Sequence, residues 1–225
     1  MAKYGLGIDF GSLSARAVLI DVANGKCVAS GSHSYKNAVM ESINGVPLGE
    51  GWALQNPADY LESMTLCVKK AVSDAKIDVE DIIGIGVDFT ACSILPIRKD
   101  GTPLSFEEKF KDNPHAYVKM WKHHAAEPYA NEITHKAVAR GEEFLKKFES
   151  ISSEWLIPKI MQIVCEAPEV YKEADKIIEA GDWIVMMLTG VDSRNSCAAG
   201  YKGQYDEKSG YMNKDFLKSF RFRLP

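Results

Sequence analysis

The feature that most constrains the fold of this chain is a short turn between two apolar segments near the N-terminus. Residues 4–10 and 15–22 have the composition and length of strands, and glycine and serine residues separate them. The pair Asn24-Gly25 is a strong hairpin signal, and residues 26–35 form a third strand candidate. We therefore predict that the chain opens as an antiparallel meander of three strands.

Further along, the pattern mixes helices with short strands. Asn56 followed by Pro57 predicts a helix start, and apolar residues at helical spacing extend this helix to residue 75. The apolar run 82–89 predicts a strand buried on both faces. The remaining expected elements are a loop at 39–55, strands at 94–97 and 177–180, and helices at 115–130, 136–148, 153–167, 168–174 and from Asp182 to Gly190. This order predicts an α/β domain with a mixed sheet flanked by helices, and residues 201–225 stay unassigned.

Composition excludes several classes of protein. The net charge of the 225 residues is −4 without a basic stripe, which disfavours a nucleic-acid partner. The longest apolar runs are too short to span a membrane, and the N-terminus lacks a signal-peptide pattern, so we expect a cytoplasmic protein. The five cysteines lack a CxxC spacing, which favours reduced thiols, and buried packing is a better interpretation of them than catalysis.

The turn itself points to phosphate chemistry. Neither a P-loop nor a dinucleotide fingerprint is present, because the turn leads into a strand and not into a helix. A tight Gly-Ser turn nevertheless directs backbone N–H groups into a concavity that suits an anion. Asp9 at its edge suits a hydrated Mg²⁺ ion. On residue chemistry alone, a plain hairpin with a turn-forming aspartate remains the favoured alternative.

The spacing D-x-G-[ST]-x-x-x-R resembles the first phosphate loop of the actin–hexokinase superfamily. This resemblance implies an actin-like (ribonuclease H-like) ATPase domain that uses ATP and Mg²⁺. It assigns metal contact to Asp9. The phosphate-binding residues that it implies are Gly11, Ser12, Ser14 and Arg16.

Four further stretches resemble the FGGY carbohydrate kinases. They are IGIGVDFTACS at 83–93, MWKHH at 120–124, SSEWLIPKI at 152–160 and GDWIVMMLTG at 181–190. GWALQNPADY at 51–60 and AAGYKG at 198–203 narrow the resemblance to the branch that phosphorylates L-ribulose, the L-ribulokinases. The chain departs from the W-x-D-x-R pattern of the broader family, since it has Trp-Lys-His-His at 121–124, which weakens a glycerol kinase or xylulokinase interpretation.

The resemblance implies a sugar site for a ketopentose substrate. Its residues would be Phe89, Thr90, Ala91, Trp121 and Lys202. Without the resemblance, Trp121 would be interpreted as a core residue and Lys202 as a solvated lysine. Asp88 is either a candidate base or a turn cap, and we do not assign it as the catalytic base. The adjacent His123 and His124 point about 100° apart on a helix and make a poor metal pair.

In the family, the catalytic aspartate, the adenosine pocket and the second phosphate loop lie in a second domain. We find none of them in this sequence, so the expectation is that residues 1–225 form the N-terminal, sugar-binding domain of such a kinase, with a C-terminal kinase domain as its partner. The isolated chain should then be inactive and should bind sugar weakly. A catalytically dead sugar sensor and an actin-like interaction module remain alternatives, and homodimerisation stays open.

Overall fold

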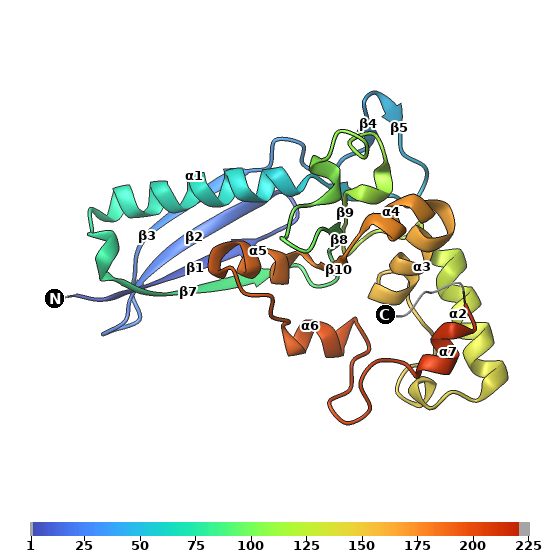
Figure 1. Ribbon diagram of the computed structural model, residues 1–225. Helices are drawn as coiled ribbons and strands as arrows, with labels where there is room; N and C mark the ends of the chain where they lie inside the picture. The colour runs from blue at the N-terminus through green and yellow to red at the C-terminus, as the bar shows by residue number, and fades with distance from the viewer. Residues whose placement is uncertain (1, 221–225) are drawn as a thin grey trace. The chain divides into compact units, whose positions relative to one another are not determined.

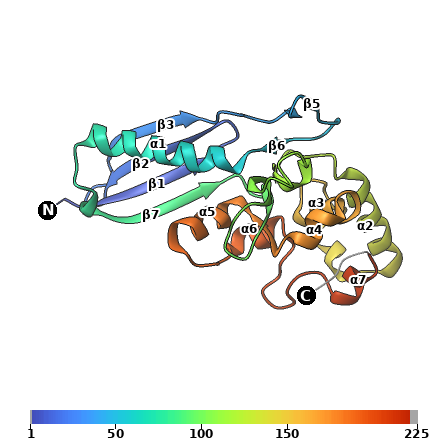
Figure 2. The same ribbon diagram turned by 45° about the horizontal axis from the view of Figure 1, so that its top comes forward.

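The computed structural model describes residues 2–220, which fold into two compact units (Figures 1 and 2). The first unit comprises the residues up to 40 together with 55–90. The second unit comprises 41–54 together with the residues from 91 onward. Each unit has its own sheet and its own buried apolar residues.

The first unit is built on a four-stranded sheet with the order β3-β2-β1-β7 (Figure 1). β2 runs antiparallel to both β1 and β3, whereas β7 runs parallel to β1. The strands are β1 (Tyr4–Phe10), β2 (Ser14–Asp21), β3 (Cys27–Ser34) and β7 (Ile82–Phe89). The predicted opening meander is confirmed, and the parallel fourth strand makes the sheet mixed, as predicted.

One face of this sheet is covered by the helix α1 (Pro57–Ala75), which packs mainly on β2 and β3. Asn56 caps the helix by accepting a hydrogen bond from the backbone N–H of Ala58 at 3.0 Å, which confirms the predicted start. Gly31 in β3 allows a close approach of the helix, because a Cβ there would lie 2.2 Å from the carbonyl oxygen of Cys67.

The prediction of burial on both faces is wrong for β7. This strand lies at the edge of the described sheet, next to β1 alone, and the side chains of Ile83 and Ile85 are 61% and 54% exposed. The helix α1 contacts β2 and β3 far more than this edge. The apolar run therefore indicated a strand correctly but not its burial, because burial depends on which elements pack on each face.

The second unit contains a four-stranded sheet with the order β10-β8-β9-β6 and a separate two-stranded hairpin. β8 runs antiparallel to both β9 and β10. The strands are β4 (Ser42–Ile43), β5 (Val46–Pro47), β6 (Leu54–Gln55, of which residue 55 is counted in the first unit), β8 (Ile94–Ile97), β9 (Val118–Lys119) and β10 (Lys176–Glu179). The two strands expected after residue 90 are confirmed, whereas the expected loop at 39–55 contains β4, β5 and β6.

The helices of the second unit follow β9 in the chain. They are α2 (Glu127–Arg140), α3 (Leu156–Glu166), α4 (Pro168–Glu173), α5 (Ala180–Thr189), α6 (Ser196–Tyr201) and α7 (Lys214–Lys218). The helices predicted at 153–167 and 168–174 correspond to α3 and α4. The unassigned tail contains α7, and its residues 221–225 lie outside the described residues. Within residues 2–220, no helix combines the length and the apolarity that crossing a bilayer requires.

Two predicted helices are wrong. The segment expected to be helical at 115–130 begins with a 3-10 turn (Pro114–Ala116) capped by Asn113, and it continues as β9, where Lys119 pairs with Ile94. Pairing with β8 thus outweighs helix propensity in this segment. The helix α2 starts later and ends at Gly141, which adopts a left-handed φ of 65°, so the helix expected at 136–148 is also wrong.

The last predicted helix has the correct end and the wrong start. Gly190 follows α5 with a left-handed φ of 70°, as expected of a C-terminal glycine. Asp182 lies inside the first turn of α5 and does not cap it, because the helix begins at Ala180. The carboxylate of Asp182 instead accepts a hydrogen bond from the backbone N–H of Asn195 at 2.9 Å.

Two histidines are buried in the second unit as neutral rings. His123 is fully buried, where its Nδ1 accepts from the N–H of Ala53 at 3.3 Å and its Nε2 lies 2.8 Å from Oε1 of Gln162. Burial, together with the nearby Lys119, lowers the pKa of His123 to about 2. The same two causes lower the pKa of His115 to about 3. Both rings therefore resist protonation in the folded state.

We expect the substitution His123→Gln to reduce the loss of stability in acid. Below pH 6.5 the unfolded chain takes up a proton on this imidazole while the folded chain does not, so the contribution of His123 to the free energy of unfolding is present above pH 6.5 and is lost as the pH falls. Between pH 7 and pH 5 this loss should amount to about 2 kcal/mol.

Urea unfolding at these two pH values measures the effect. The exposed His135, on α2, provides the control substitution His135→Gln, which should leave the pH dependence of the parent chain unchanged. An acid-dependent loss that is the same in the His123 variant and in the parent would contradict the neutral, buried state of this ring.

Candidate functional site

Hydrogen bonds to its backbone fix the turn between β1 and β2. The N–H of Gly11 donates to the carbonyl of Ser14 at 3.0 Å and closes the turn. Nε2 of Gln55 donates to the carbonyl of Ser12 at 2.9 Å, and the hydroxyl of Tyr60 donates to Oε1 of Gln55 at 2.6 Å. Both supporting side chains are buried, so their hydrogen bonds hold the turn in one conformation.

Three charged residues form one row beside this turn. Asp9 of β1 pairs with Arg16 of β2 on one side and with Asp88 of β7 on the other. Residues that pair directly across a sheet project to the same face, which here is the face opposite α1. Asp9 is half-buried, and the other two residues are exposed. The row thus places two carboxylates and one guanidinium at the end of the sheet that carries the turn.

These groups suit a phosphate ester with its metal. A Mg²⁺ ion is commonly held by one or two carboxylates with water, and Asp9 with Asp88 supplies carboxylates on adjacent strands. Arg16 and the hydroxyl groups of the turn supply donors for phosphate oxygens. The residues predicted for phosphate and metal therefore lie together in the first unit.

Phe89, predicted to contact sugar, packs within an aromatic cluster of the first unit. Its ring stacks on Phe10 with ring centroids 5.1 Å apart and meets Tyr60 edge-on at the same separation. Tyr35 extends the cluster, 5.4 Å from Tyr60. Phe89 is half-buried and has a clear structural role here. The half-buried Thr90 follows it at the end of the first unit.

Ala91 begins the second segment of the other unit, and the residue after it has an unusual backbone. Cys92 is fully buried and adopts a left-handed φ of 68°, which is rare for a residue other than glycine. Burial raises the pKa of the Cys92 thiol to about 12, so the thiol is protonated at neutral pH and is a poor nucleophile. The predicted packing role suits Cys92, but it does not extend to Cys27 and Cys197, which are exposed.

Lys202 is not the solvated lysine that its residue type alone suggests. Its side chain is 14% exposed, and Nζ lies 3.1 Å from Oε2 of Glu154. Its carbonyl accepts a hydrogen bond from the N–H of Leu156 at 3.2 Å, at the start of α3. Lys202 is therefore held through both its side chain and its backbone. Trp121, from the same unit, is half-buried.

Two functional candidates were missed in the sequence. Lys159 on α3 is fully buried and donates to the carbonyls of Cys92 and Met120, each at 2.6 Å. Glu179 accepts a hydrogen bond from the N–H of Cys92 at 2.7 Å. Burial lowers the pKa of Lys159 to about 8 and raises that of Glu179 to about 7. A lysine inside the apolar segment WLIPKIM was the available signal.

The predicted residues divide between the two units. Those in the first unit are Asp9, Gly11, Ser12, Ser14, Arg16, Phe89 and Thr90, and those in the second are Ala91, Trp121 and Lys202. The pair His123 and His124 does not act together: the first ring bonds to Ala53 and Gln162, and Nδ1 of the second lies 3.4 Å from the hydroxyl of Ser153.

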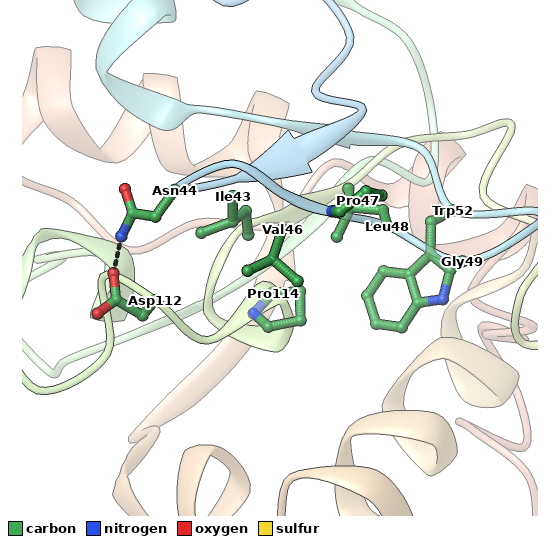
Figure 3. Close-up of a pocket in the computed structure, with 9 residues that line it drawn as sticks. All are labelled: Ile43, Asn44, Val46, Pro47, Leu48, Gly49, Trp52, Asp112 and Pro114. Atoms are coloured by element: carbon green, nitrogen blue, oxygen red, sulfur yellow. Dashed lines mark hydrogen bonds between the residues drawn. The ribbon is translucent and has the colours of Figure 1, made fainter.

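A pocket of about 410 Å³ lies in the second unit, at the hairpin of β4 and β5 (Figure 3). Its lining is mainly apolar, and a hydrogen bond between Asn44 and Asp112 closes one end. The lining residues are Ile43, Asn44, Val46, Pro47, Leu48, Gly49, Trp52, Asp112 and Pro114. None of them belongs to the predicted phosphate or sugar set.

The fold of the chain is that of sugar kinases with the actin-like ATPase fold. It is similar to the crystal structure of gluconate kinase from Lactobacillus acidophilus, with a TM-score of 0.76 at 20% identity over 99% of this chain and 40% of that one. It is also similar to the ligand-bound xylulose kinase of the same organism, with a TM-score of 0.71 at 21% identity over 98% of this chain and 40% of that one.

The chain belongs to the FGGY family of carbohydrate kinases, since that family's N-terminal domain matches residues 4–222. Among curated relatives, the ribulokinase of Halalkalibacterium halodurans is 46% identical over 226 residues, which cover 99% of this chain and 40% of the relative. The ribulokinase of Bacillus licheniformis is also 46% identical, over 94% of this chain and 39% of the relative. The chain thus spans about 40% of the length of these relatives.

Proposed function

We propose that this chain is the N-terminal, sugar-binding domain of an ATP-dependent kinase that phosphorylates L-ribulose at its terminal hydroxyl. The observation that carries the proposal is the 46% identity to proteins named ribulokinase across nearly the whole chain. The row formed by Arg16, Asp9 and Asp88 beside the Gly-Ser turn supports it, because phosphoryl transfer depends on groups of this kind at the phosphates.

Residues of the first unit would hold the phosphate end of ATP. Asp9 would bind Mg²⁺ directly or through its water, and the half-buried position of this carboxylate beside a fixed turn fits that task. Mg²⁺ would supply neutralisation of charge on the phosphate oxygens. The N–H groups and hydroxyls of the turn, with Arg16, would bind and orient the transferring phosphoryl group. Electrostatic stabilisation of this kind provides most of the rate enhancement in many enzymes.

The second unit would provide the sugar contacts. Trp121 would offer a flat apolar face to the sugar, and Lys202, already oriented by Glu154, would donate to its hydroxyls. Ala91 would leave space for a ketopentose. Phe89 and Thr90 complete the proposed set from the end of β7.

The proposal assigns the catalytic base and the adenosine site to a further C-terminal domain, in keeping with the 40% share of the relatives that this chain spans. Residues 1–225 alone should then show no ATP-dependent phosphorylation of L-ribulose, whereas the protein that includes the C-terminal domain should show it. A coupled assay of ADP release with both proteins measures this. Phosphorylation by residues 1–225 alone would contradict the assignment of the base.

In the protein with both domains, Asp9→Asn should lower kcat by about a hundredfold or more, because it removes a charge that acts on the transferring phosphoryl group. The KM for L-ribulose should change by less than about twofold, since this side chain is not proposed to touch the sugar. Steady-state kinetics with L-ribulose and ATP gives both values.

Asp74→Asn is the matched control for this substitution. It removes one carboxylate from the same unit, where Asp74 makes an exposed ion pair with Lys70 on α1. This variant should keep the parent kcat. Retention of full turnover in Asp9→Asn would contradict the proposed role of Asp9 at the transferring phosphate.

A further inference from the structure

We infer that Lys159 is a positioning residue that holds two separate backbone segments of the sugar site in register. This inference rests on the proposed function, because it concerns the residues assigned there to the sugar. Lys159 itself is fully buried and would not touch the substrate. Its effect would pass through the two peptide groups to which its ammonium donates.

Both bonds of Lys159 end next to a proposed sugar contact. One goes to the carbonyl of Cys92, the residue after Ala91, at 2.6 Å. The other goes to the carbonyl of Met120, the residue before Trp121, at 2.6 Å. A single ammonium group therefore joins the segment after β7 to the segment after β9, within the same unit.

The first of these segments needs such support. The left-handed φ of 68° at Cys92 is unfavourable for a residue with a Cβ, so contacts outside the residue must maintain it. Lys159 binds the carbonyl of Cys92, and the carboxylate of Glu179 accepts from its N–H at 2.7 Å. Both polar groups of this residue are thus bonded to charged side chains, which make stronger hydrogen bonds than neutral groups.

The start of α3 also fixes the third proposed sugar contact. Glu154, just before the helix, lies 3.1 Å from Nζ of Lys202, and the N–H of Leu156 donates to the carbonyl of Lys202 at 3.2 Å. Residues 154–159 therefore contact Lys202 and the chain neighbours of Ala91 and Trp121 through three hydrogen bonds to backbone carbonyls and one ion pair. This gives the segment SSEWLIPK a physical role: it sets the distance between the groups that would meet the sugar.

The other buried lysine of this unit provides a matched control. Lys119 is as fully buried as Lys159, but its Nζ has no hydrogen-bond partner among residues 2–220 and lies over the ring of Trp52 at 4.2 Å. Methionine is similar to lysine in length, so either substitution removes one buried amine and keeps most of the side-chain volume. Only the Lys159 substitution releases the carbonyls beside Ala91 and Trp121.

The test compares Lys159→Met and Lys119→Met in the protein with both domains. We expect Lys159→Met to raise the KM for L-ribulose about tenfold or more while the KM for ATP stays within about twofold of the parent value. Lys119→Met should leave both KM values unchanged. A folded Lys159→Met variant with the parent KM for L-ribulose would overturn the inference.

Two additions keep the test decisive. If Lys159→Met does not fold, Lys159→Leu is judged by the same criterion, because leucine also lacks a donor for the two carbonyls. Amide hydrogen exchange gives a readout that does not depend on activity: Lys159→Met should speed exchange in peptides that cover 90–95 and 118–123, with the amides of α1 as internal reference. Unchanged exchange in both peptides would overturn the inference, whatever the activity of the protein. Absence of L-ribulose phosphorylation by the protein with both domains would instead refute the proposed function.

Discussion

The pairing of β1 with β2 on one side and with β7 on the other is the constraint on which the first unit depends. It brings Asp9 level with Arg16 and Asp88, although residues 9 and 88 are far apart in the chain. The same register stacks Phe10 on Phe89 on the opposite face, where α1 packs. One set of backbone hydrogen bonds thus builds an apolar support on one face and a charged row on the other.

A different kind of interaction organises the second unit. Its strands are short, and the ends of the paired strands β8 and β9 are held by two ionisable side chains, the buried Lys159 and the half-buried Glu179. Burying a charge costs free energy unless it is hydrogen-bonded, and the ammonium of Lys159 meets this condition through its two carbonyl acceptors. Such a network specifies one arrangement of the backbone, which is what a site for a small sugar requires.

The sequence was most informative where local chemistry decides the structure. The start of α1 is set by Asn56 and Pro57, and the end of α5 by Gly190, through the backbone preferences of these residues. Both predictions are confirmed. The sequence failed where distant elements decide. The exposure of Ile85 depends on where α1 packs. The hydrogen bonds of Lys159 go to carbonyls more than thirty residues away, so its proposed role can be inferred only from the folded chain.

The most direct measurement is a crystal structure of the protein with both domains in complex with L-ribulose. The proposed function predicts that the sugar lies within hydrogen-bond distance of Nζ of Lys202 and packs against the ring of Trp121. It further predicts that Lys159 retains its bonds to Cys92 and Met120 in the complex. A sugar bound elsewhere, for example in the pocket beside Trp52, would contradict the assignment of the sugar site.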